Sequence, residues 1–188
     1  VQVKVQGNSA GAKVNTSSVL SSTNVVNSTG TTSDTLNVYA TPTVTKVFGT
    51  STISASGTTT LSITLGNPAG NPGNLTGITV ADVFPVSPGA MTVGSASTTN
   101  GCSGGSASLQ GKTGAGAYGT VAVNNTAVQV SGLTLAAGTT CTVVVTITAS
   151  ASGTYANTTT VVTATGPIAL TGLVSNTATL VVSALNPR

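Results

Sequence analysis

Hydrophobic and polar residues alternate with a period of two along much of this 188-residue chain. Side chains on a β-strand point alternately to the two faces of the sheet, so this alternation predicts half-buried strands. We find no stretch with a helical period, and clusters of Gly, Asn and Pro predict the turns. The clearest inward-facing sets are Val1/Val3/Val5, Leu61/Ile63/Leu65, Val128/Val130, Val143/Val145/Ile147 and Ala178/Leu180/Val182.

The start of the chain is a diverged copy of its end. Val1 aligns with Val143 and Thr35 with Thr177 without a gap, and eleven of the pairs between them are identical. After a small insertion, Pro42 corresponds to Pro187. We therefore predict that residues 1–41 are the C-terminal third of one β-module, and that 42–188 form a complete sandwich of about eight strands.

The partial module cannot close a two-layer core with its few strands alone. Two sources could complete it: a preceding module of a longer chain, or strands from another subunit by strand complementation. Arrays of β-modules are usually built for reach and strength.

The composition narrows the classes of function. Hydrophobic residues are 39% of the chain, which argues against disorder, and charged residues only 4%. The net charge of +3 comes from five basic residues that form no cluster, so a nucleic-acid partner is not predicted. With so few charges, the electrostatic repulsion between copies of the chain is weak, so close self-association is tolerated. The longest apolar run is far below the roughly 18 residues of a spanning helix, so no transmembrane segment is predicted.

The chain has few side chains of the kinds that catalyse reactions or bind cofactors and metals. Histidine is absent and the chain has only two acidic residues, so we predict neither an enzyme nor a cofactor nor a metal site. Cys102 and Cys141 are the only cysteines, and such a pair predicts a disulfide and an oxidising, extracellular compartment. Acceptor sequons for N-glycosylation, in about the number expected by chance, start at Asn15, Asn27, Asn74, Asn124 and Asn157.

Three polar residues fall on inward-facing positions. Lys46 shares its face with Val44 and Phe48. Asp82 shares its face with Val80 and Phe84, and Asn176 shares its face with Ala178 and Leu180. Burying an unpaired ammonium or carboxylate is costly. One explanation is a buried Lys–Asp pair with an Asn hydrogen bond, or strand ends that reach water. The other is an intramolecular isopeptide bond, in which a neutral Lys46 amine attacks the Asn176 carboxamide and protonated Asp82 assists.

A series of short motifs carries a resemblance to a known family. They are Pro42-Thr-Val-Thr-Lys46-Val-Phe48, Thr60-Leu-Ser-Ile-Thr-Leu-Gly-Asn67, Ile78-Thr-Val-Ala-Asp82-Val-Phe-Pro85, Gly138-Thr-Thr-Cys141, Gly153-Thr-Tyr-Ala-Asn157 and Ser175-Asn176-Thr-Ala-Thr-Leu180. In order and spacing they resemble the conserved-repeat family of bacterial surface proteins known as domain of unknown function eleven. The resemblance implies an immunoglobulin-like sandwich used in tandem on cell surfaces, and a Lys–Asn isopeptide with an acidic helper at Lys46, Asn176 and Asp82.

In the partial module, Asp34 takes the place of Asn176. If another chain completes residues 1–41, we expect Asp34 to meet an inward lysine there and to crosslink subunits. The whole pattern predicts a structural subunit or repeat of an extracellular filament or surface fibre, with another copy of itself as partner. The alternative is a spacer or ligand-binding repeat of a long cell-surface adhesin.

Overall fold

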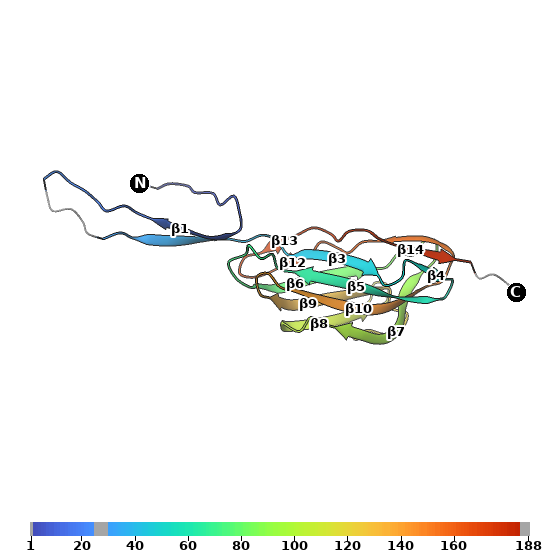
Figure 1. Ribbon diagram of the computed structural model, residues 1–188. Coiled ribbons are helices and arrows are strands. Elements are labelled where there is room, and N and C mark those ends of the chain that lie inside the picture. Colours follow the sequence, from blue (N-terminus) through green and yellow to red (C-terminus); the bar gives the residue numbers. More distant parts are fainter. Residues whose placement is uncertain (1, 25–29, 185–188) are drawn as a thin grey trace.

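The structure, a computed structural model, describes residues 2–24 and 30–184, and all regular elements in these ranges are β-strands (Figure 1). The strands are β1 (Gly11–Thr16), β2 (Ser33–Val38), β3 (Thr43–Phe48), β4 (Thr52–Ser54), β5 (Thr58–Gly66), β6 (Leu75–Val83), β7 (Met91–Asn100), β8 (Gly105–Lys112), β9 (Ala127–Leu135), β10 (Thr140–Ala149), β11 (Gly153–Asn157), β12 (Thr163–Ala164), β13 (Leu170–Thr171) and β14 (Ala178–Ser183).

Strands β3 to β14 form an immunoglobulin-like β-sandwich. One layer has the order β3-β5-β10-β7, and the facing layer contains β13-β12-β6-β9-β8. A third sheet, β11-β14-β4, continues alongside β6 of the second layer: the backbone amide of Thr160, which follows β11, donates to Ala81 O of β6. The sequence predicted fewer strands, because β4, β12 and β13 are too short to produce an alternating pattern.

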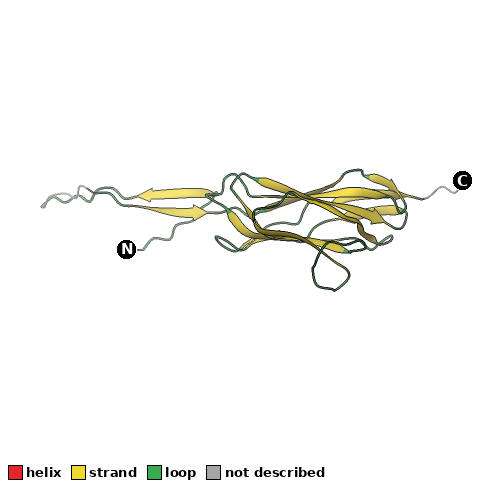
Figure 2. Cartoon of the chain, turned by 90° about the horizontal axis from the view of Figure 1, so that it is seen from below, coloured by secondary structure: helices red, strands yellow, loops and turns green. Residues whose placement is uncertain are grey.

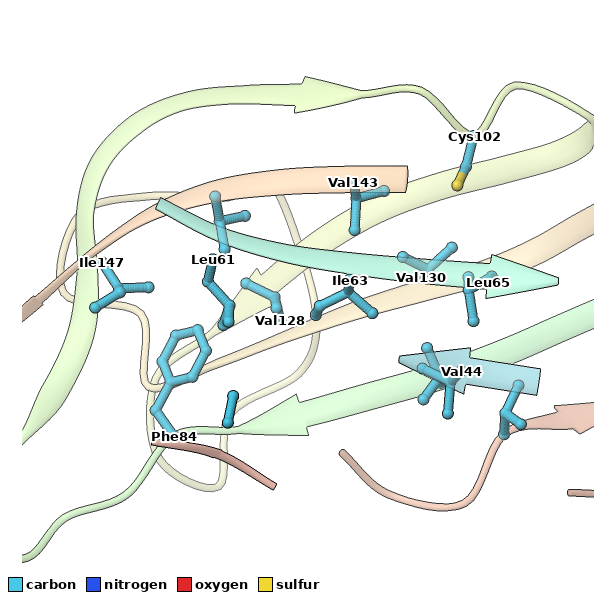
Figure 3. Close-up of a cluster of buried hydrophobic side chains, with 14 of the residues drawn as sticks. Val44, Leu61, Ile63, Leu65, Phe84, Cys102, Val128, Val130, Val143 and Ile147 are labelled. Atoms are coloured by element: carbon cyan, nitrogen blue, oxygen red, sulfur yellow. The ribbon is translucent and has the colours of Figure 1, made fainter. Parts of the chain in front are cut away.

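The core lies between the inner faces of the layers (Figure 3). The alternation predicted these faces correctly for the apolar sets of β5, β9, β10 and β14: for example, Ile63 of β5 and Val143 of β10 are 2% and 0% exposed. The largest side chain in the core, Tyr155 of β11, is also fully buried. Its hydroxyl donates to Ala151 O and accepts from Ala151 N, which satisfies the one polar atom of the side chain.

Residues 2–24 and 30–41 lie outside the sandwich as an extension (Figures 1 and 2). Their two strands, β1 and β2, pair antiparallel as a separate two-stranded sheet. The repeat matches β1 to β11 and the start of β2 to the approach to β14, and β11 and β14 also pair antiparallel. Gly11 and Gly153, which open β1 and β11, both have a positive φ, of 125° and 137°. The β1–β2 pair of the extension thus resembles the β11–β14 pair of the complete module.

The strand predicted from Val3 and Val5 is absent from the described residues before Gly11, and Val1 lies outside them. In the complete module the matching residues, Val145 and Ile147, are 0% exposed because β10 lies between β5 and β7. Val3 and Val5 have no such neighbours and are 78% and 73% exposed. A strand needs a partner for its backbone hydrogen bonds, so the alternation alone was not sufficient.

Two buried asparagines hold the junction between extension and sandwich. The Asn71 carboxamide accepts from Ala40 N at 2.6 Å and donates to Ala40 O at 3.0 Å. It also donates to Asn67 Oδ1, and Asn67 Nδ2 in turn donates to Gly73 O and Leu135 O. The chain just before β3 is thereby fixed to the loop between β5 and β6.

Candidate functional site

Among the described residues, Lys46 and Asp82 are the two charged side chains that are buried in the sandwich. Lys46 comes from the middle of β3 and Asp82 from the end of β6, and strand alternation turns both toward the core, where they are 3% and 1% exposed. Lys46 Nζ donates to Asp82 Oδ2 at 2.5 Å. The second carboxylate oxygen, Asp82 Oδ1, is buried and has no hydrogen-bond partner.

A third residue, Asn157, completes this cluster. It is the last residue of β11, shares an inward face with Tyr155, and is 2% exposed. Its Nδ2 donates to Asp82 Oδ2 at 3.3 Å, so the amine of Lys46 and the carboxamide of Asn157 meet at the same oxygen. We call Lys46, Asp82 and Asn157 the core triad. From the sequence, Asn157 was predicted only as a glycosylation candidate and as part of a family-like motif, although its spacing of two from Tyr155 indicated a shared face.

Burial changes the acid–base properties of the core triad. Desolvation lowers the pKa of Lys46 from its ordinary value, against the attraction of Asp82. Desolvation likewise raises the pKa of Asp82, against the charge and hydrogen bond of Lys46 and the hydrogen bond from Asn157. Both shifts favour the neutral forms, so transfer of one proton from Lys46 to Asp82 removes both charges from the core.

The inward orientation predicted for Asn176 is wrong. Asn176 is exposed and lies two residues before β14, outside any strand, where no ladder of hydrogen bonds fixes the alternation. Its carboxamide contacts the Lys46 backbone instead: Oδ1 accepts from Lys46 N and Nδ2 donates to Lys46 O, both at 2.9 Å. Asn176 therefore contacts the outer edge of β3, while Asp82 holds the Lys46 amine.

In the extension, Asp34 and Asn15 are register partners across the β1–β2 hairpin, and both are exposed. The Asp34 carboxylate accepts from the neighbouring backbone amide of Thr35. The repeat aligns Asn15 with Asn157, so Asn15 is the counterpart of the core triad's asparagine. The intersubunit crosslink at Asp34 remains a prediction.

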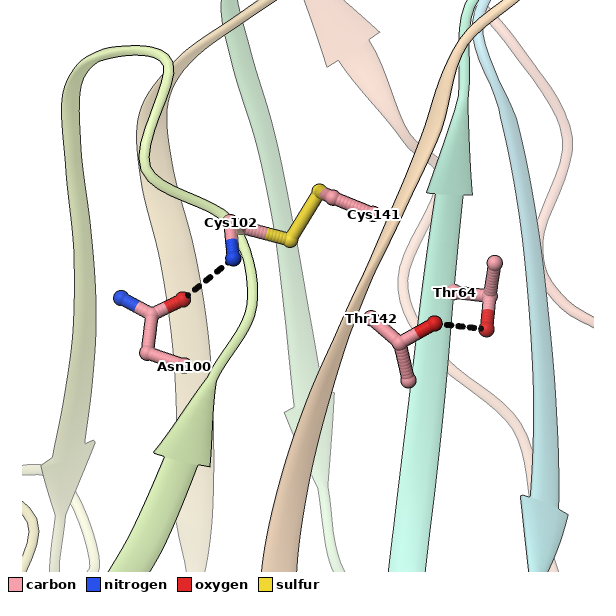
Figure 4. The surroundings of a disulfide bond; sticks show 5 residues. All are labelled: Thr64, Asn100, Cys102, Cys141 and Thr142. Atoms are coloured by element: carbon pink, nitrogen blue, oxygen red, sulfur yellow. Dashed lines mark hydrogen bonds between the residues drawn. A yellow bond between two sulfur atoms is a disulfide. The ribbon is translucent and has the colours of Figure 1, made fainter.

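Cys102 and Cys141 form a disulfide (Figure 4). It joins the loop after β7 to the start of β10, and it closes a sequence separation of 39 residues. Cys102 is completely buried in the core cluster, and its backbone amide donates to Asn100 Oδ1.

The sequons differ in accessibility. Asn15, Asn74 and Asn124 are exposed, and Asn27 lies outside the described residues. Asn157 is excluded as an acceptor in the folded protein, because its carboxamide is buried against Asp82. Within 2–24 and 30–184 no three His, Cys, Asp or Glu side chains gather where they could hold a metal ion. The same ranges contain no helix long and apolar enough to cross a membrane.

The fold and the core triad define a disulfide-bonded, immunoglobulin-like β-sandwich module that carries a short β-extension. Residues 42–182 match one protein family along almost the entire sandwich. The chain belongs to that family, described as Domain of unknown function (DUF7933). No curated protein matches the sequence.

This family corrects the resemblance drawn from the sequence motifs. The sandwich belongs to DUF7933 and not to domain of unknown function eleven. The quoted motifs are short alternating strands between Gly- and Asn-containing turns, and many β-sandwiches share these. What was implied by the resemblance alone therefore has no family support.

Several solved structures are similar in fold. A non-cellulosomal cohesin from the hyperthermophilic archaeon Archaeoglobus fulgidus has a TM-score of 0.48 at 9% identity, over 74% of this chain and 90% of the cohesin. The seventh ScaB type I cohesin from Pseudobacteroides cellulosolvens has a TM-score of 0.41 at 11% identity, over 77% and 94% of the two chains. The C-terminal domain of the AgI/II polypeptide BspA from Streptococcus agalactiae has a TM-score of 0.44 at 11% identity, over 81% and 53%.

Proposed function

We propose that this chain is a structural module of an extracellular filament or surface fibre, and that its modules connect by completing residues 1–41. Its role is mechanical and not enzymatic. The observation that carries the proposal is the contrast between repeat partners: Val145 and Ile147 are fully buried, whereas Val3 and Val5 are 78% and 73% exposed. Residues that are core in one copy of a module are expected to be core in the other, once it is complete.

The complete module indicates what kind of partner would cover Val3 and Val5 of the extension. There, the strand that contains Val145 and Ile147 lies between β5 and β7 and packs against the facing layer. The extension therefore needs a surface with a free strand edge and an apolar inner face, from another copy or an adjoining module. The low charge of the chain fits such close contact, because few like charges would have to approach one another.

The geometry of the module fits a linear assembly. The extension leaves the sandwich at one end, and β14 runs to the opposite end (Figure 1). Repeated head-to-tail contacts between such ends give an open filament. The disulfide and the absence of a long apolar helix in the described ranges are compatible with an extracellular location.

Negative-stain electron microscopy of the purified full chain, across a concentration series, tests the proposal. We expect filaments or linear oligomers for the unaltered chain, and their loss in a Val3→Ser/Val5→Ser variant. Val86→Ser is the matched control, because Val86 is 76% exposed but lies on the sandwich. Particles that stay monomeric at all concentrations would contradict self-assembly, and would favour the alternative of a spacer or ligand-binding repeat in a long adhesin.

The repeat also refines the predicted crosslink between subunits. If the completing surface presents a lysine and an acid as the core triad does, Asn15 is the counterpart of Asn157, and Asp34 is its neighbour across the hairpin. Multimers that survive boiling in reductant, and that disappear in an Asn15→Ala/Asp34→Ala variant, would support this crosslink. A fully monomeric band from the assembled material would refute it.

A further inference from the structure

We propose that the core triad is an autocatalytic modification site, which forms an isopeptide bond between Lys46 Nζ and Asn157 Cγ with Asp82 as proton carrier. The inference does not depend on the proposed assembly, because every participating group lies within one sandwich. It also replaces Asn176, the acceptor expected from sequence, with Asn157.

The three groups of the core triad are positioned for the reaction. Lys46 Nζ and Asn157 Nδ2 both donate to Asp82 Oδ2, at 2.5 and 3.3 Å, so one oxygen holds the nucleophile beside the carboxamide. The three residues come from different sheets and are at most 3% exposed. Water is thus kept from competing with the amine, and the reacting groups are held together in advance.

The hydrogen-bonding atoms of the core triad are incompletely satisfied in a permanent ion pair. A buried ion pair is stable only when further hydrogen bonds satisfy its remaining polar atoms. Here Asp82 Oδ1 is buried without a partner. Bond formation would remove the ammonium from the core and leave a neutral amide and a neutral carboxylic acid.

The step balances without an external reactant. Lys46 first transfers a proton to Asp82, which leaves a neutral amine and a carboxylic acid. Rotation of the Asn157 carboxamide turns its oxygen toward the acid, which polarises the carbonyl while Nζ attacks Cγ. Asp82 then moves the proton that Nζ loses to the departing nitrogen. The new Nζ–Cγ bond replaces the Cγ–Nδ2 bond, ammonia leaves, and Asp82 is regenerated.

The bond would change how the module carries tension. It links β3, which follows the extension, directly to the end of β11. The segment between Lys46 and Asn157, with the disulfide inside it, becomes a closed covalent loop. A force applied at residue 42 and at β14 passes through the crosslink, so the strands from β5 to β10 cannot be pulled out.

Intact-mass spectrometry of the full chain tests the proposal. After reduction, we expect a mass below that of the sequence by one ammonia. An unchanged mass overturns the proposal. A deficit of one water also overturns it, because it would indicate condensation of Lys46 with Asp82.

Peptide mapping locates the bond. Trypsin cleaves after lysine and arginine, and a lysine in an isopeptide bond is not cut. Digestion of the denatured, reduced chain should therefore leave residues 14–112 intact and joined to 113–188. Separate peptides 14–46, 47–112 and 113–188 would contradict the bond.

Matched variants identify the acceptor. Asn157→Ala should abolish the mass deficit, whereas Asn176→Ala should keep it, because the Asn176 carboxamide hydrogen-bonds to the Lys46 backbone. Asn157→Asp separates chemistry from folding, because a carboxylic acid can still condense with Lys46, with loss of water in place of ammonia. A deficit that persists in Asn157→Ala or vanishes in Asn176→Ala would overturn the assignment of Asn157.

Discussion

The side chain of Asn176 hydrogen-bonds to the backbone of Lys46. The carboxamide accepts from Lys46 N and donates to Lys46 O, both at 2.9 Å. Two such bonds imitate a neighbouring strand, and they cover the edge of β3 that faces away from β5. Lys46 is thus held at both ends, by Asn176 at the backbone and by Asp82 at the amine.

The first prediction concerns this edge contact. Asn176→Ala removes two hydrogen bonds and should lower the free energy of unfolding by about 1–2 kcal/mol. Faster hydrogen exchange of the Lys46 amide, measured by NMR, should accompany it. Thr179→Ala is a suitable control, since Thr179 is an exposed side chain on the neighbouring β14. An unchanged exchange rate at Lys46 would contradict the contact.

The second prediction compares the removal of one charge of the buried Lys46–Asp82 pair with the removal of both. In an Asn157→Ala background, which cannot form the proposed bond, Asp82→Leu leaves the Lys46 ammonium buried without its partner. We expect a loss of about 3–5 kcal/mol in the free energy of unfolding.

Adding Lys46→Met to that variant should restore most of the loss, because an apolar pair of similar volume needs no desolvated charge. Denaturant unfolding of the three proteins gives the comparison. If the triple variant (Asn157→Ala/Asp82→Leu/Lys46→Met) is no more stable than the double variant (Asn157→Ala/Asp82→Leu), the cost comes from packing and not from charge.

The third prediction concerns the disulfide. Cys102→Ser/Cys141→Ser opens a loop with a sequence separation of 39 residues. Loop-closure entropy for this length corresponds to about 4 kcal/mol, so the midpoint of thermal unfolding should fall markedly. Calorimetry under identical conditions measures the fall. A midpoint equal to that of the unaltered chain would mean that the bond contributes little to stability.

The fourth prediction concerns the junction with the extension. Asn71→Ala leaves Ala40 N and O without their side-chain partners and should cost about 1–3 kcal/mol locally. Hydrogen exchange of the Ala40 amide should become faster, while that of core amides such as Val143 changes little. Asn74→Ala is the matched control, because Asn74 lies in the same loop and is exposed. Equal exchange of the Ala40 amide in both variants would argue against the contact between Asn71 and Ala40.

The alternation determined most of the fold and part of the site. It placed Lys46 and Asp82 in the core, because both lie inside strands whose neighbours on the same face are buried. It failed for Asn176, which lies before β14 and outside any strand. It also failed for Val3 and Val5, which pair with no strand of the described residues. Alternation predicts a face only where a ladder of hydrogen bonds keeps the strand extended.

The sequence alone thus determined an all-β fold, its cysteine pair, the internal repeat and the inward orientation of two charged residues. Only the tertiary structure decided that Asn157, and not Asn176, meets them, since three separate sheets bring the core triad together. Local pattern specifies which way a side chain points. Which side chains then meet depends on how the layers pack over one another, and this is set by long-range contacts that no short stretch of sequence contains.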